Sequence, residues 1–251
     1  MDAVDRLPGF RRRLLVERGA DWVRSALEDD FHCMAVTLRH DQGLVTAVEP
    51  LMRRAPWTTC PGAVERLRLT FTGAALSDFA GRGDKRSNCT HLYDLALLAA
   101  AHAFDTAPPV YDILVSDPID GRRTAELRRD GVRLLGWIDR EHRIVEPAEL
   151  AGRRLDELQA WIDGLDPVRQ EAARLLRWGA IIAHGRSIPM ERQSDARRMP
   201  PNCYSFQPER AHVARRVGEV RDFSRGGAQL FDRPFDINSS RDGQVTVRRL
   251  A

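Results

Sequence analysis

Two of the four cysteines in this chain stand at positions that favour reactive sulfur chemistry. Cys60 comes directly before Pro61, a residue type that often starts a helix, and Cys89 comes directly before an apolar segment that begins at Thr90. The free N–H groups at a helix N-terminus create a positive potential, which lowers a thiol pKa and favours the thiolate. Cys60 and Cys89 are therefore candidate metal ligands or nucleophiles. The alternative is that both are buried structural residues.

A histidine can complete this set. His32 shares one face of a predicted strand with Met34, so it points toward whatever covers the sheet. If the two helices pack on that face, the imidazole meets both cysteines. Two thiolates and one imidazole, with a fourth position for water, substrate or Asp30, form a ligand set for a single zinc or iron ion.

The segment after Cys89 contains a further pair of polar residues. His91 and Asp94 are three residues apart on the predicted helix, which places them on one face. Asp94 can then orient His91 as a base or as a partner of a metal ligand. A hydrogen-bond network in the first turn of the helix is the alternative.

A long segment without regular pattern follows the predicted helices and includes Cys203 and Tyr204. Long loops in compact domains are often lids over a site, so we predict that Met199–Phe206 closes over the cysteines. A surface crossing with Cys203 merely buried is the alternative.

The elements that must position these residues are readable from alternation, turn signals and helical spacing. The first fifty residues predict an antiparallel meander. The remainder predicts a second antiparallel sheet, or a continuation of the first, followed by helices, and together these indicate an α+β fold with an α+β C-terminal extension. The predicted domains are 1–106 with the Cys/His site, 107–223 with the second sheet, helices and loop, and a polar tail at 224–251. Strands are predicted at 10–17, 20–28, 32–39, 44–52, 110–116, 122–128, 132–139 and 143–145, and helices at 63–71, 89–104, 150–165 and 167–183.

Composition excludes several classes of function. Among 251 residues, 39 basic and 36 acidic side chains nearly cancel, so no nucleic-acid partner is expected. No apolar run has the length of a membrane span, and the N-terminal residues lack the pattern of a signal peptide. We therefore expect a cytoplasmic, bacterial-type protein with free or metal-bound thiols and a small-molecule substrate, and we leave a homo-oligomer open.

Three motifs carry a resemblance to known families. Asp30-Phe31-His32, the segment 54–63 and the segment 89–95 resemble a bacterial family known as a domain of unknown function, over most of the chain. Residues 30–105 also resemble the iron–sulfur cluster scaffold (NifU/IscU-like) fold, which implies a small antiparallel sheet with a cysteine opening each of two helices. The scaffolds carry their first cysteine where this chain has Asp30-Phe31-His32, and this departure from the family favours a mononuclear centre over a cluster.

These observations lead to one main hypothesis and two alternatives. The main hypothesis is a metal-dependent hydrolase or lyase that acts on a small organic substrate through zinc or iron held by His32, Cys60 and Cys89. The second is a non-enzymatic metal or sulfur carrier with an open site. The third is a metal-free thiol enzyme, with Cys60 or Cys89 as nucleophile and His91 as base.

Overall fold

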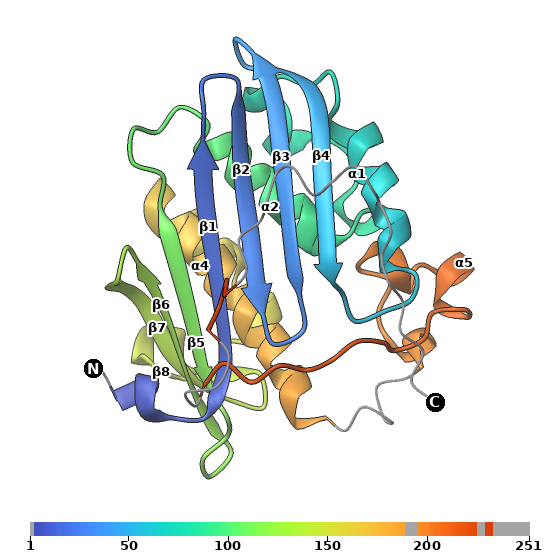
Figure 1. Ribbon diagram of the computed structural model, residues 1–251. Coiled ribbons are helices and arrows are strands. Elements are labelled where there is room, and N and C mark those ends of the chain that lie inside the picture. Colours follow the sequence, from blue (N-terminus) through green and yellow to red (C-terminus); the bar gives the residue numbers. More distant parts are fainter. Residues whose placement is uncertain (1–2, 189–194, 225–228, 233–251) are drawn as a thin grey trace. The chain divides into compact units, whose positions relative to one another are not determined.

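A computed structural model of the chain describes residues 3–188, 195–224 and 229–232 (Figure 1). The chain divides into two compact units. Unit 1 is made of Met1–Arg13, Val110–Pro189 and Arg221–Leu230, and unit 2 of Leu14–Pro109, Met190–Val220 and Phe231–Ala251. Most of the predicted polar tail, 225–228 and 233–251, lies outside the described residues.

Unit 2 is built on an antiparallel meander in which each strand follows its neighbour through a short turn. In the register, Ala26 lies opposite Ala35, which in turn lies opposite Leu51. The turn at Gln42 and Gly43 has positive φ at both residues (46° and 89°), the conformation that matches the twist of a two-residue hairpin. The strands are β1 (Gly9–Arg18), β2 (Trp22–Asp29), β3 (Cys33–Asp41) and β4 (Leu44–Arg54).

Two helices cover one face of this meander (Figure 1). α2 (Thr90–Ala101) packs on β2 and β3, and α1 (Ala63–Phe71) packs on β4. Met34, Val36 and Leu38 alternate along β3 and are completely buried, and the intervening Ala35 and Thr37 are buried as well, so both faces of β3 are covered. α2 is apolar almost all round because it lies in the core of unit 2.

Unit 1 contains the second half of the strands and the longest helix. α4 (Pro167–Ala183) packs on β5, β6 and β7. It begins as predicted, because Asp166 accepts a hydrogen bond from the backbone N–H of Arg169 and Pro167 occupies the first turn. The remaining elements are β5 (Val110–Ser116), β6 (Arg122–Arg129), β7 (Val132–Arg140), β8 (Arg143–Glu146), α3 (Gln159–Asp163) and α5 (Pro208–Ala211), of which α5 belongs to unit 2.

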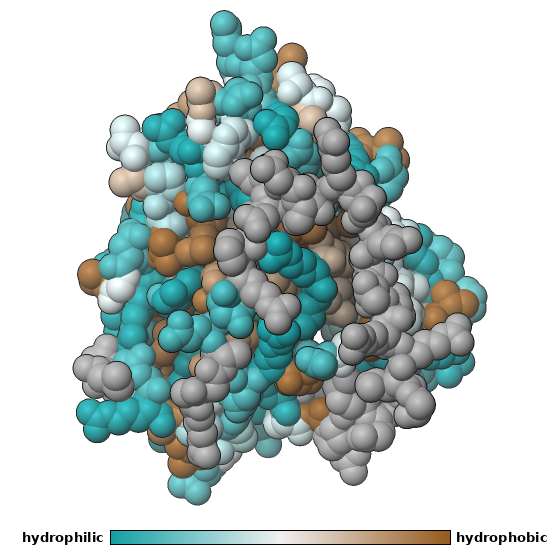
Figure 2. Space-filling model, in the orientation of Figure 1, coloured by the Kyte–Doolittle hydropathy of each residue, from teal (hydrophilic) through white to brown (hydrophobic). Residues whose placement is uncertain are grey.

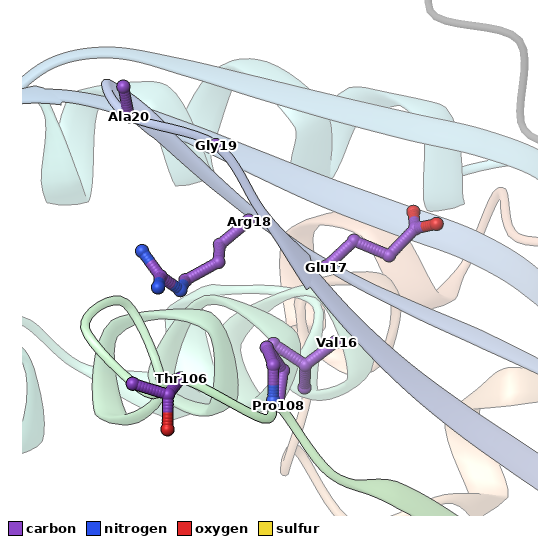
Figure 3. A pocket seen from close by; sticks show the side chains of 7 residues that line it. All are labelled: Val16, Glu17, Arg18, Gly19, Ala20, Thr106 and Pro108. Carbon is purple, nitrogen blue, oxygen red and sulfur yellow. The ribbon is translucent and has the colours of Figure 1, made fainter.

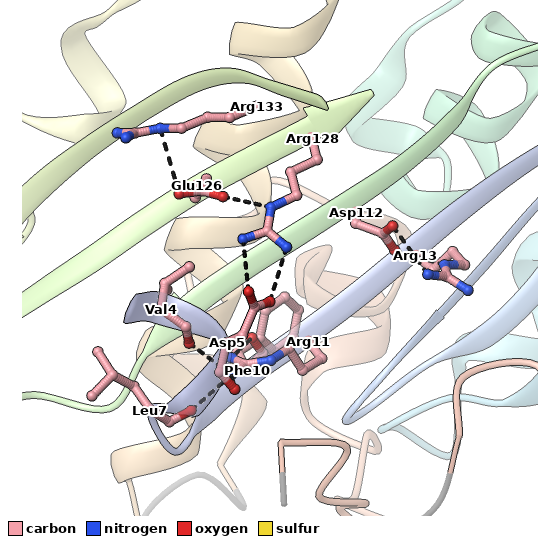
Figure 4. Close-up of polar contacts among 10 residues, drawn as sticks. All are labelled: Val4, Asp5, Leu7, Phe10, Arg11, Arg13, Asp112, Glu126, Arg128 and Arg133. Atoms are coloured by element: carbon pink, nitrogen blue, oxygen red, sulfur yellow. Dashed lines mark hydrogen bonds and ion pairs between the residues drawn. The ribbon is translucent and has the colours of Figure 1, made fainter. Parts of the chain in front are cut away.

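Arginine side chains fasten the N-terminal residues to unit 1 (Figure 4). The guanidinium of Arg11 donates to the backbone oxygens of Val4 (3.1 Å) and Leu7 (2.7 Å). Arg128 forms a two-pronged ion pair with Asp5 at 2.9 and 3.1 Å. These bonds satisfy charged groups that the sheet would otherwise bury without partners.

The predicted fold class, an α+β protein with a NifU/IscU-like core and an α+β C-terminal extension, is wrong. The structure has one eight-stranded antiparallel sheet in the order β4-β3-β2-β1-β5-β6-β7-β8. β1 belongs to both units: its first residues, up to Arg13, are part of unit 1, and its last residues, from Leu14, are part of unit 2. The edge of β1 that β2 leaves free is a template for another strand, and β5 pairs there.

The helix predicted at 150–165 is also absent. The segment forms short 3-10 turns at Ala148–Leu150 and Leu155–Glu157, followed by the single-turn helix α3. Gly152 has a φ of 84°, which interrupts any continuous helix there. The apolar residues at helical spacing are buried nevertheless, so their periodicity reflects packing of an irregular segment.

Among the described residues, no helix has both the length and the hydropathy that a membrane span requires. On the face drawn in Figure 2, hydrophilic residues predominate over the described surface and hydrophobic residues form small scattered groups.

Candidate functional site

The turn between β2 and β3 is organised by one buried carboxylate. Asp29, the last residue of β2, accepts hydrogen bonds from the backbone N–H groups of Phe31 and His32, both at 2.7 Å. The same oxygen lies 2.9 Å from Nδ1 of His32. Asp side chains favour such turns because they capture the backbone N–H groups two and three residues further on. The turn therefore fixes the imidazole of His32 against the carboxylate.

His91 joins this pair from the first turn of α2. Its ring centroid lies 3.9 Å from that of His32, with the ring planes inclined by 30°. Asp29, His32 and His91 each offer a ligand atom, and these atoms lie within 4.8 Å of one another. The three residues are 0%, 4% and 7% exposed, so the group is closed to bulk water. It is the one such group of three among the residues that the structure describes.

The hydrogen bond that Nδ1 of His32 donates to the carboxylate of Asp29 decides which ring nitrogen keeps a free lone pair. A carboxylate beside Nδ1 favours the tautomer that carries its proton there, which leaves the lone pair on Nε2. A carboxylate that orients a histidine in this way also raises the basicity of the other nitrogen. In the absence of a metal the arrangement suits His32 as a general base through Nε2, whereas a metal shared with Asp29 would take the place of the proton on Nδ1.

The two predicted cysteines lie nearby in unit 2 but do not form that group. Cys89 is the N-cap of α2, as predicted, whereas Cys60 begins the 3-10 turn Cys60–Gly62 and Gly62 is the N-cap of α1. Neither cysteine shares a group of three ligand atoms within 4.8 Å with His32 among the described residues.

The predicted lowering of the thiol pKa values is wrong. Burial raises the pKa of Cys60 and of Cys89, and it raises the pKa of Cys203 to about 11. The loss of hydration outweighs the positive end of the helix because the thiols are almost fully covered. Cys60 also accepts a hydrogen bond from the hydroxyl of Ser205 at 3.4 Å. The thiols are therefore neutral near pH 7 unless a cation binds them.

The predicted acidic partners have other contacts. Asp94 accepts a hydrogen bond from Nζ of Lys85 at 2.6 Å, and Asp29, not Asp94, belongs to the group with His91. Asp30 is completely buried next to Asp29, and its backbone oxygen accepts from the guanidinium of Arg54 at 2.7 Å.

The segment predicted as a lid lies against the cysteines. The backbone N–H of Tyr204 donates to the carbonyl of Asn88 at 2.8 Å, and the phenol oxygen of Tyr204 covers Gly62 so closely that a Cβ there would lie 2.6 Å away. The guanidinium of Arg210 stacks on the Tyr204 ring, 3.9 Å from its centroid. Backbone hydrogen bonds and close packing hold Cys203 and Tyr204 in place.

The chain segment that follows Tyr204 and Arg210 places Arg216 against aromatic residues beside the site. Arg216 forms an isolated antiparallel bridge with Trp57, supported by a hydrogen bond from the N–H of Val217 to the carbonyl of Pro56 at 3.0 Å. Its guanidinium carbon lies 5.3 Å from the ring centroid of Phe31 and 5.6 Å from that of Trp57.

A second group of titratable residues lies in unit 1. The rings of His142 and His184 stack with centroids 3.6 Å apart, and Nε2 of His184 lies 3.1 Å from the completely buried Asp139. His142 has a φ of 65° in the two-residue turn between β7 and β8. Burial and the neighbouring His184 lower the pKa of His142. The separation of these residues in the sequence leaves no local pattern by which to find them.

A surface pocket of about 490 Å³ lies elsewhere in unit 2 (Figure 3). Its wall is formed by Val16, Glu17, Arg18, Gly19, Ala20, Thr106 and Pro108. None of the three residues of the buried Asp/His/His group lines it, and Nε of Arg18 is already bonded to the carbonyl of Asp105 at 2.5 Å. The pocket is therefore not part of the candidate site.

Asp29 is the member of the site that the sequence analysis missed. The available signal was local: an aspartate three residues before a histidine, at the end of a strand and before a tight turn. Comparison of the chain with models of protein families, with curated proteins and with solved structures gave no match, so the candidate site rests on this geometry alone.

Proposed function

We propose that Asp29, His32 and His91 bind one divalent metal ion, zinc or iron, and that the protein is a metal-dependent enzyme of the hydrolase or lyase type. The observation that carries this proposal is the convergence of three buried ligand atoms within 4.8 Å. Two imidazoles and a carboxylate are the ligands that zinc and non-haem iron(II) take in catalytic sites.

The surroundings of the group support a catalytic role more than a carrier role. A carrier needs a solvent-open site from which metal can exchange, whereas all three residues here are buried. A bound cation would polarise a substrate carbonyl or activate water in such a site. A cation shared by Asp29 and His32 would bind Nδ1, which lies 2.9 Å from the Asp29 oxygen, and the carboxylate is anchored by two backbone N–H groups.

A metal-free thiol enzyme is the weaker alternative. Burial raises the pKa of Cys60 and Cys89, which disfavours the thiolate that such an enzyme needs. If no metal binds, the bond between Asp29 and Nδ1 of His32 instead favours His32 as a general base, with Nε2 taking the proton.

The metal content of purified variants tests the proposal and separates it from the ligand set predicted from the sequence. The protein is incubated with Zn²⁺ or Fe²⁺, desalted and assayed for bound metal by elemental analysis. We expect about one equivalent per chain in the wild type and in Cys60→Ser and Cys89→Ser, and a loss in His32→Ala and His91→Ala. His212→Ala, at an exposed histidine, is the matched control.

Each other outcome has a clear meaning. Metal that is lost from both cysteine variants but kept by His91→Ala would replace the proposed ligands with His32, Cys60 and Cys89. Metal that is absent from the folded wild-type protein would refute the metal centre.

A further inference from the structure

Arg216 is a cation without a counter-ion in the part of the chain that the structure describes. Its side chain has no hydrogen bond or ion pair to any other described residue, and its Nε is buried with no acceptor among them. Two other inward-facing arginines have carboxylate partners: Arg54 pairs with Glu28 at 3.1 Å, and Arg186 with Asp117 at 3.1 Å.

An unpaired guanidinium in this environment is costly. Burying an ionised group without a hydrogen-bonding partner is unfavourable, and native proteins rarely leave buried donors unsatisfied without a functional reason. Phe31 and Trp57 offset part of the cost through cation–π contacts, but an aromatic face accepts no hydrogen bond in the plane of the guanidinium. The donors in that plane remain available to an anion.

Arg216 is also held in place before any ligand arrives. The bridge to Trp57 and the hydrogen bond between the N–H of Thr58 and the carbonyl of Arg215 (2.9 Å) fix its backbone. Phe206 packs edge-on against Trp57, with centroids 5.4 Å apart, and so supports one wall. A fixed, planar donor loses little entropy when it binds a planar acceptor.

The position of Arg216 connects it to the buried Asp/His/His group. Phe31, the aromatic residue beneath the guanidinium, precedes His32 and meets its ring edge-on with centroids 6.2 Å apart. The charge of Arg216 also acts electrostatically on the thiol of Cys60 and opposes the rise in its pKa that burial causes. Arg216 therefore lies beside the site, with Phe31 between its guanidinium and His32.

We infer that Arg216 is the carboxylate-binding residue of this site and that the substrate is a small carboxylic acid with an apolar or aromatic body. This inference rests on the proposed function. A carboxylate matches the planar fork of a guanidinium with two parallel hydrogen bonds. Phe31 and Trp57 would contact the apolar part of the acid, and the reacting group would extend past Phe31 toward His32.

Titration with benzoate tests the inference, with benzamide as the uncharged analogue of the same shape. Binding is measured by calorimetry on the zinc-incubated wild type, on Arg216→Gln and Arg216→Lys, and on the control Arg215→Gln, an exposed neighbour. We expect saturable benzoate binding that is weaker by about tenfold or more in Arg216→Gln, unchanged in Arg215→Gln, and about tenfold or more tighter than benzamide binding. Arg216→Lys should fall between wild type and Arg216→Gln, because it keeps the charge and loses the fork.

The His32→Ala variant separates this inference from the metal proposal. Benzoate binding that still depends on Arg216 in this variant supports the anion site even if no metal binds. A wild type that binds metal but shows no saturable benzoate binding, or binds benzoate and benzamide equally, overturns the inference and leaves the metal centre standing. If Arg216→Gln does not fold, the inference is tested by benzoate binding to Arg216→Lys and by the ratio of benzoate affinity to benzamide affinity in the wild type.

Discussion

Replacing Asp29 by alanine should destabilise the protein far more than removing an exposed aspartate with a similar local bond. The substitution leaves three donors without their acceptor: the N–H groups of Phe31 and His32 and Nδ1 of His32. Each buried unsatisfied donor costs about 1–3 kcal/mol, and breaking a buried polar network typically costs about 3–5 kcal/mol in total. We therefore expect a loss of about 3–5 kcal/mol from the free energy of unfolding, a large part of the stability of an ordinary domain.

The isosteric change separates the structural role of Asp29 from its charge. An asparagine at this position would keep an oxygen for the two backbone N–H groups but lose the negative charge, so Asp29→Asn should cost only about 1–2 kcal/mol. It should also weaken metal binding by about 10–100-fold, since the proposed centre loses its only charged ligand.

Urea denaturation followed by circular dichroism measures the stabilities, and competition with a chromogenic chelator measures metal affinity. The matched control is Asp84→Ala, because the exposed carboxylate of Asp84 accepts a single hydrogen bond, from the N–H of Arg86 at 2.9 Å. Its loss should cost about 1 kcal/mol or less. An Asp29→Ala variant no less stable than Asp84→Ala would refute the reasoning, and full metal affinity in Asp29→Asn would remove Asp29 from the centre.

Three further predictions concern other parts of the chain. Burial and His184 lower the pKa of His142, so the unfolded chain takes up the proton first and the stability of the protein falls as the pH drops below about 6.5. The variant His142→Asn, whose side chain also tolerates the positive φ, should therefore show a smaller fall in Tm between pH 7.5 and pH 5 than the wild type. An equal fall in Tm would contradict this prediction. Gly62→Ala should cost about 1–3 kcal/mol because its Cβ would lie 2.6 Å from the phenol oxygen of Tyr204, and adding Tyr204→Phe should recover part of that loss in the same denaturation assay. Cys89 should react with a disulfide reagent at pH 8 only after unfolding, because burial raises its pKa; mass spectrometry showing rapid labelling of the native protein would count against this.

The strands and their turns were predictable because both signals are local. Alternation of apolar and polar residues identifies the segments, and pairs such as Asp130-Gly131, with φ of 53° and 79°, reverse the chain between β6 and β7. The start of α4 was predictable for the same reason, since Asp166 and Pro167 act within one turn. These features depend on residues that are neighbours in the sequence.

The joining of the strands into one sheet was not predictable in this way. Whether β5 pairs with β1 or begins a new sheet depends on which strand edge is free after the meander has formed. The helix predicted at 150–165 was wrong for a related reason. The apolar residues of this segment are buried by an irregular chain with short 3-10 turns, and their spacing happens to match that of a helix.

By itself, the sequence determined where most strands lie, that Cys89 caps a helix, and that His32 and His91 were candidates for chemistry. The tertiary structure decided that His91 meets His32 and Asp29, and that Arg216 arrives between Phe31 and Trp57 from far along the chain. It also reversed the expected direction of the thiol pKa shifts. Local patterns report the backbone conformation of a few residues, whereas ligand sets and pKa values depend on packing between distant segments and on how completely that packing removes water.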